Sequence, residues 1–198
     1  TAIQNIVSIT SDQSVAMAIR LEALSILRSW PKPSGRDRIT GLWRPVKPVL
    51  ISQVAHVVQP VLTSLIQDPE PQVQQSAILL AGDLSLAISV DTLTSLLRNH
   101  DNPPLHRQLA VTSLTKINPP KLLQILRTVI DDPQDSVRAI ALRSLAKLQP
   151  REAVGPLRQI LTSGSIANKQ SALQTLGELS TDGADLILSE WMHKLLDQ

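Results

Sequence analysis

Apolar residues recur along this chain at the spacing of amphipathic helices. Five stretches align without gaps on an alanine, which is followed at once, and again four positions later, by an apolar residue. Positions i, i+1 and i+4 fall on one face of a helix. The pattern therefore predicts five amphipathic helices, which are centred on Ala23, Ala77, Ala110, Ala141 and Ala172.

Other apolar-periodic stretches lie between these helices. They occupy residues 57–66, 92–97, 122–130 and 153–161, and a final one with Trp191 occupies 185–196. No segment alternates with period two for long enough to indicate a β-strand. The sequence thus predicts an all-α protein in which each unit is a helix, a short turn and a second helix.

The spacing of the five alanines indicates an internal repeat. Successive alanines are 54, 33, 31 and 31 residues apart, which gives a unit of about 31 residues and an insertion in the first interval. A single helix pair of this length cannot bury its apolar face, whereas stacked copies bury it against each other. We therefore predict one α-solenoid of about five helix pairs over residues 1–198, with the helix at 185–196 capping its end.

Charged positions also repeat. A cation stands three residues before the alanine in four copies, at Arg20, Arg107, Arg138 and Lys169. An aspartate stands nine residues before it in three copies, at Asp68, Asp101 and Asp132, and each is followed within two positions by Pro. Such an Asp-Pro turn before a helix is typical of an N-cap with Pro in the first turn.

The motif Asp-Pro-x-x-x-Val-Arg-x-x-Ala-Leu, clearest at residues 132–142, resembles the HEAT repeat in its short bacterial form. The resemblance covers nearly the whole chain outside the insertion. It implies that the Asp and Arg positions form a structural ladder of hydrogen bonds along the stack. The implied ladder residues are Asp68, Asp101, Asp132, Arg107 and Arg138. Gln74 and Ser163 break the two patterns, so we expect an incomplete ladder.

The composition excludes several kinds of chemistry. The chain has no Cys, Tyr or Phe and three Trp, so disulfides, thiolate nucleophiles and Cys-ligated metals are absent and base-stacking platforms are not expected. A net charge of +2 argues against nucleic acid as a partner. The four His are far apart, and His106 replaces an apolar residue of the repeat, which favours packing over metal binding. No catalytic, cofactor-binding or metal-ligating residue and no membrane insertion is expected, and we predict that this segment is not an enzyme.

The insertion at residues 31–50 is the unique feature of the chain. Its four prolines and two glycines exclude a regular helix. It carries five cations against one carboxylate, while the rest of the chain is net negative. Two of the three tryptophans, Trp30 and Trp43, bracket its basic part.

Three interpretations of this ordered loop remain open. It could fold back over the solenoid, with Trp43 in a groove and its arginines paired with helix carboxylates. It could instead be a contact epitope, because Trp and Arg are enriched at interface hot spots. It could also be an anion site. The candidate partner-binding residues are Trp30, Arg36, Arg38, Trp43 and Arg44.

Residues 30–45 also resemble a segment of large bacterial haem-binding proteins of the PVC type, which are similar to sorbosone or glucose dehydrogenases. This resemblance implies a helical connector that is exported with its parent, with catalysis and haem attachment elsewhere. The chain starts with Thr rather than Met, so we expect a segment of a longer protein.

The function predicted from these observations is a non-catalytic scaffold. It would bind a protein partner or an adjacent domain of the same chain. The alternative is a DNA-binding or DNA-repair enzyme, because some HEAT-like solenoids resemble glycosylases that hold DNA with Trp, Asp and basic residues. The basic loop with Trp43 would then contact the DNA.

Overall fold

The computed structural model describes residues 1–37, 40–45 and 47–196. These residues form eleven α-helices and one short 3-10 helix, with no β-strand among them. The prediction of an all-α fold is confirmed. The elements are α1 (Ala2–Ser11), α2 (Met17–Ser29), α3 (Ile51–Ile66), α4 (Pro71–Asp83), η1 (Ala87–Ser89), α5 (Val90–Arg98), α6 (Pro104–Ile117), α7 (Leu122–Val129), α8 (Asp135–Leu148), α9 (Pro150–Ser163), α10 (Ile166–Gly177) and α11 (Asp182–Leu196).

The helices alternate as the repeat requires. The even-numbered helices α2, α4, α6, α8 and α10 carry the five aligned alanines, all of which are buried. The odd-numbered helices α3, α5, α7 and α9 contain the apolar stretches between them. The first of these begins at Ile51, six residues earlier than the apolar pattern indicated.

Contacts divide the chain into two compact units. Unit 1 comprises Thr1–Asn102 and Thr112–Pro119, and unit 2 comprises Pro103–Val111 and Pro120–Gln198. The boundary passes through α6, so the units do not coincide with whole repeats. The single solenoid over 1–198 stays a prediction.

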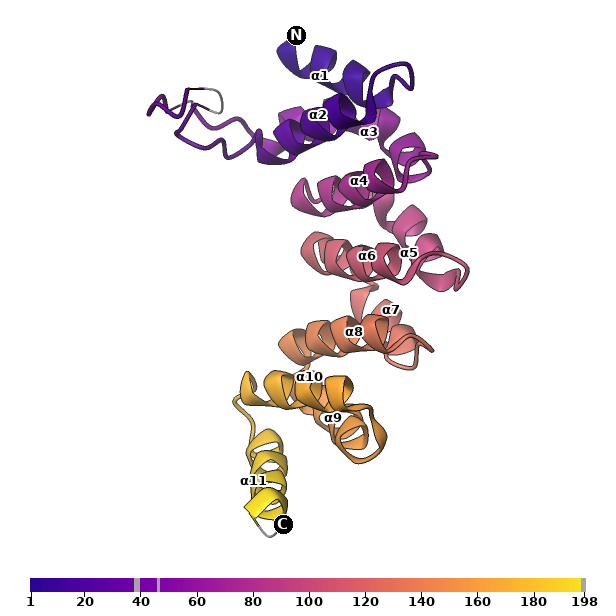
Figure 1. Ribbon diagram of the computed structural model, residues 1–198, viewed down its shortest axis with the longest axis vertical. Coiled ribbons are helices and arrows are strands. Elements are labelled where there is room, and N and C mark those ends of the chain that lie inside the picture. The colour runs from indigo at the N-terminus through magenta and orange to yellow at the C-terminus, as the bar shows by residue number, and fades with distance from the viewer. Residues whose placement is uncertain (38–39, 46, 197–198) are drawn as a thin grey trace. The chain divides into compact units, whose positions relative to one another are not determined.

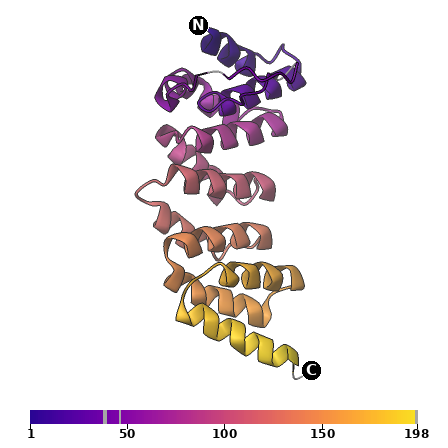
Figure 2. The same cartoon turned by 90° about the vertical axis from the view of Figure 1, so that its left-hand side faces the viewer.

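Within unit 1, helices that hold the same position in successive helix pairs lie side by side. Helix α2 packs against α4, and α1 packs against α3, as both views show (Figure 1, Figure 2). Small alanines at the centre of α2 and α4 allow this close approach, and leucines fill the space around them. Leu24, Leu27, Leu62 and Ile78 are almost fully buried in this core.

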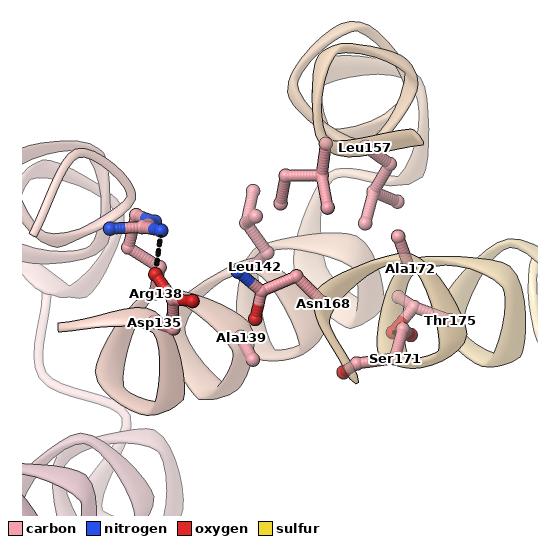
Figure 3. Close-up of a pocket in the computed structure, with 10 residues that line it drawn as sticks. Asp135, Arg138, Ala139, Leu142, Leu157, Asn168, Ser171, Ala172 and Thr175 are labelled. Atoms are coloured by element: carbon pink, nitrogen blue, oxygen red, sulfur yellow. Dashed lines mark hydrogen bonds and ion pairs between the residues drawn. The ribbon is translucent and has the colours of Figure 1, made fainter. Parts of the chain in front are cut away.

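In unit 2, α8 packs against both α9 and α10, and α11 packs on α9 and α10. Figure 3 shows a pocket where Leu142 of α8, Leu157 of α9 and Ala172 of α10 meet. Its volume is about 10 Å³, which is about the space that one water molecule needs. This pocket is a packing seam of the repeats and has no room for a ligand.

Candidate functional site

The repeated Asp and Arg positions form ion pairs between successive repeats. In unit 1, the guanidinium of Arg20 on α2 donates to both carboxylate oxygens of Asp68, which lies in the turn before α4. Its Nε donates to the Thr10 carbonyl at 2.9 Å. Both charged side chains are almost completely buried. A buried charge pair of this kind contributes to the register of the stacked helices, because a shift by one residue would leave two charges without partners.

Unit 2 has an equivalent pair between Arg107 of α6 and Asp132 in the turn before α8. Both side chains are again buried, and burial lowers the pKa of Arg107. Arg107 and Asp132 occupy the same repeat positions as Arg20 and Asp68. Each pair therefore links one repeat to the turn of the next.

Two of the possible pairs between the Arg position of one repeat and the Asp position of the next are missing. Position 74 corresponds to the arginine that would pair with Asp101, but it is Gln, and Asp101 is exposed. Arg138 would pair with position 163, but this residue is Ser and has no charge. Arg138 instead donates to Asp135 in its own helix (Figure 3). It also donates to the Asp132 carbonyl.

The prediction that these aspartates are N-caps is wrong for Asp68 and Asp132. The N-cap residues of α4 and α8 are Glu70 and Gln134. Asp68 and Asp132 lie two residues earlier and accept the backbone N–H of those caps, at 3.0 and 2.8 Å. The carboxylates stay in the turn because their second oxygen accepts from the buried arginine of the preceding repeat.

A second ionic chain in unit 1 was not singled out by the sequence pattern. Asp83 of α4 accepts hydrogen bonds from Arg28 of α2 and Lys116 of α6, each at 2.6 Å. Burial by itself raises the pKa of Asp83, but the hydrogen bonds from Lys116 and Arg28 hold it below its ordinary value. The only signal for this chain was the similar place of the three residues at the ends of successive helices.

The segment from Trp30 to Leu50 joins α2 to α3 and projects away from the helices of unit 1 (Figure 1). Its residues from Gly35 to Arg44 form a small turn structure, which we call the Trp43 hairpin. Arg36 and Trp43 form an isolated antiparallel bridge. Backbone bonds flank this bridge, from Asp37 to Leu42 at 2.8 Å and from Arg44 to Gly35 at 2.7 Å.

Side chains and one glycine stabilise the turn of the hairpin. The Asp37 carboxylate accepts from the backbone N–H and the hydroxyl of Thr40, at 2.8 and 2.9 Å. Gly41 adopts a φ of +69°, which disfavours residues with a side chain. The Arg36 guanidinium donates to the Gly41 carbonyl at 3.2 Å. The described part of the turn is therefore ordered by its own hydrogen bonds.

Trp43 is held by this hairpin but is open to solvent. Its side chain is 70% exposed. Its ring lies directly against Gly35, since a Cβ atom added there would come within 2.3 Å of it. The interpretation in which Trp43 packs into a groove is therefore wrong. Arg36 and Arg44 form no ion pair with a helix carboxylate among the residues that the structure describes.

A hollow of about 690 Å³ lies between the end of α2 and the connecting segment, and we call it the α2 hollow. Its lining has an apolar part and a cationic part. The lining residues are Ser25, Ile26, Ser29, Trp30, Pro33, Ser34, Arg36, Asp37, Arg44, Lys47 and Val49.

The structure brings together three of the predicted partner-binding residues in this lining, namely Trp30, Arg36 and Arg44. Trp43 lies on the same hairpin but does not line the hollow. Arg38 falls outside the described residues. Sequence reasoning missed the contribution of α2, because which helix lies beside a loop depends on tertiary packing.

Two further observations concern metal ions and membranes. Within the described ranges, no cluster of three or more His, Asp or Glu side chains could ligate a metal ion. No described helix combines the length and apolar character needed to cross a membrane.

His106, as the sequence predicted, is a buried packing residue, and burial lowers its pKa.

Comparison with protein families agrees with the repeat pattern. The family described as HEAT repeats matches residues 58–146 and 120–194, which together make up more than half of the chain. This chain belongs to the HEAT repeat family. Its solenoid fold class is thereby established. A search of curated proteins found no match.

Solved structures with a similar fold include an enzyme. Human deoxyhypusine hydroxylase, in complex with glycerol, matches with a TM-score of 0.56 and 18% identity over 97% of this chain and 67% of that one. The complex of CpcE and CpcF of phycocyanin lyase from Nostoc sp. PCC7120 matches with a TM-score of 0.44 and 15% identity, over 86% of this chain and 74% of that one.

These similarities correct one prediction. The expectation that this HEAT repeat segment is not an enzyme is contradicted, because the same fold occurs in a hydroxylase. At 18% identity the similarity concerns the fold alone, and a HEAT solenoid does not by itself argue against catalysis. The narrower resemblance to haem-binding, dehydrogenase-like proteins is not supported by any of the comparisons.

Proposed function

We propose that this HEAT repeat segment is a protein-binding scaffold and that the Trp43 hairpin is its recognition element. The partner is a separate protein or another domain of the same polypeptide. Stacked repeats offer extended surfaces on which a partner protein can bind. The hairpin adds to them a feature that occurs once, which suits a specific contact better than the repeated ladder residues do.

The exposure of Trp43 carries this proposal. A tryptophan that is 70% exposed stands on a turn fixed by backbone and Asp37 hydrogen bonds. A side chain held in place before binding loses less conformational freedom when a partner covers it. Trp and Arg are also among the residue types most enriched at interface hot spots, and the hairpin carries Arg36 as the bridge partner of Trp43 and Arg44 as the next residue.

Site-specific photo-crosslinking tests the proposal. A photoreactive residue replaces Trp43 in the protein as it is expressed in the cells that naturally make it. The matched control places it at Ile166, another large apolar residue, which is 78% exposed on α10. We expect a defined adduct from position 43 that position 166 does not give. The same adducts from both positions would contradict the proposal.

Binding of the purified crosslinked protein or domain then measures the contribution of the hairpin. We expect Trp43→Ala combined with Arg44→Ala to weaken binding by about thirtyfold, which corresponds to about 2 kcal/mol, and to leave helix content by circular dichroism unchanged. Gly35→Val, which keeps Trp43 but displaces its ring, should weaken binding in the same direction. Unfolding of the double variant would show instead that these residues serve packing.

A further inference from the structure

The α2 hollow shares Arg36, Asp37 and Arg44 with the Trp43 hairpin, but Trp43 itself does not line it. Its volume of about 690 Å³ lies in the range of ligand-binding pockets. One part of its lining is apolar, formed by Ile26 and Trp30 together with Val49. The other part carries the cations of Arg36, Arg44 and Lys47. An occupant of this hollow must therefore offer both an apolar group and negative charge.

The three cations are available to such an occupant. Arg44 and Lys47 make no side-chain hydrogen bond or ion pair with any described residue, and Arg36 donates to the Gly41 carbonyl. The carboxylate in the lining, Asp37, accepts from Thr40 within the hairpin turn. The lining thus carries three cations against one carboxylate, and a bound anion relieves the repulsion among the cations.

The size of the hollow favours an extended ligand over a compact one. Arg36, Arg44 and Lys47 all line a volume of about 690 Å³, which one inorganic anion does not fill. A single inorganic anion occupies one part of this volume, whereas a chain with several carboxylates can face all three cations. Arginine clusters recognise acidic peptide motifs in this manner.

We propose that the α2 hollow binds an extended acidic peptide segment of a partner protein. An apolar side chain of the peptide rests on Ile26, Trp30 and Val49, and its carboxylates face Arg36, Arg44 and Lys47. This proposal rests on the proposed function, because it states the chemistry of the partner segment. It adds a site that the exposed Trp43 alone does not require.

Selection from a random peptide display library tests this proposal without knowledge of the partner. The bait is the folded chain, and a parallel selection uses the charge-reversed variant Arg44→Glu with Lys47→Glu. We expect the wild type to enrich peptides rich in Asp and Glu with at least one large apolar residue, and the variant not to enrich them. Failure to enrich any peptide, or enrichment without acidic residues, would overturn the proposal.

Fluorescence anisotropy of a selected peptide then locates the site. We expect Arg44→Glu with Lys47→Glu to weaken binding by about tenfold or more. Ile26→Ser tests the apolar part and should weaken binding in the same direction. The control Lys121→Glu makes one of these charge changes at an exposed residue of unit 2, and it should leave binding unchanged. Equal loss in this control would show a nonspecific charge effect and overturn the site.

Two competitors and one further variant distinguish the other outcomes. Displacement of the peptide by millimolar inorganic phosphate would assign the hollow to a simple anion, and displacement by duplex DNA would assign it to nucleic acid. Both results overturn the acidic-peptide site. Peptides whose binding depends on Trp43 but not on Arg44 and Lys47 would overturn this site and leave the proposed function intact. Absence of a crosslink specific to position 43 would instead contradict the proposed function.

Discussion

At the scale of single residues, the buried arginines are the most specific feature of this chain. Arg20 and Arg107 are buried, charged, and aimed at an aspartate of the following repeat. Such pairs add little net stability when formed, because both charges lose their hydration. Removing one partner is costly, however, because it leaves the other charge buried without a partner. Substitution of either residue should therefore destabilise the fold strongly.

Arg107→Met is expected to lower the free energy of unfolding by about 3–5 kcal/mol, because it leaves the buried Asp132 carboxylate without its guanidinium. The matched control is Arg138→Met, which removes an arginine from the same repeat position but one paired with the exposed Asp135. The control should cost about 0–1 kcal/mol. Urea unfolding followed by circular dichroism gives both values. The double variant Arg107→Met with Asp132→Leu should recover much of the loss, and equal costs for the two single variants would contradict this account.

His106 predicts how stability depends on pH. Burial lowers its pKa below the ordinary 6.5, so the unfolded chain binds the proton at a higher pH than the folded chain does. Acid therefore favours unfolding as the pH falls through about 6.5, and this contribution levels off below the pKa of the folded state.

The measurement for His106 is the thermal midpoint between pH 5 and 8. The repeats before and after carry Val73 and Val137 at the equivalent position, so His106→Val is the natural comparison. We expect the variant to lose less stability on acidification than the wild type. Parallel pH profiles for the two proteins would show that His106 does not contribute.

At the scale of elements, each repeat is a pair of helices. The second helix carries the alanine, and the turn between the two helices carries the aspartate. The ladder connects α2 to the turn before α4, and α6 to the turn before α8. It is interrupted where Gln74 and Ser163 stand. The presence of a rung thus depends on two residues in different repeats.

Gln74→Arg is expected to add a rung with Asp101, since these positions correspond to those of Arg20 and Asp68. The gain in unfolding free energy should be below about 1 kcal/mol, because Asp101 is exposed. A double-mutant cycle with Asp101→Asn measures the coupling between the two residues. A coupling energy of zero would mean that the repeat rule does not extend to this position.

At the scale of the whole molecule, the balance of charge bears on the alternative function of DNA binding. The net charge is +2, and the excess of positive charge lies in the segment between α2 and α3, since the rest of the chain is net negative. Phosphate contacts dominate DNA affinity and need many cations along one surface. This segment has few cations, and three of them line the α2 hollow together with apolar residues.

We accordingly expect no binding of duplex DNA at physiological salt. An electrophoretic or anisotropy titration at several salt concentrations measures this, with Arg44→Glu and Lys47→Glu as the control for the basic segment. A micromolar affinity that falls steeply with salt and is lost in the control would favour the DNA-binding alternative.

The sequence by itself determined the repeat and the helix pairs, and its resemblance to HEAT repeats implied the ladder. The repeat and the helix pairs follow from local spacing, because helices with an apolar face and a small residue at its centre bury that face by stacking. It also located the segment 31–50 as different, since its prolines and glycines exclude helix. It did not determine whether catalysis occurs on this fold.

Only the tertiary structure decided which arginine meets which aspartate, and that Trp43 points to solvent while Trp30 and Ile26 line a hollow with Arg44. These contacts join residues far apart in sequence, and no local propensity specifies them. Where the chain between α2 and α3 lies depends on the end of α2 and on the hydrogen bonds of the hairpin. The hollow exists because folding places these parts side by side.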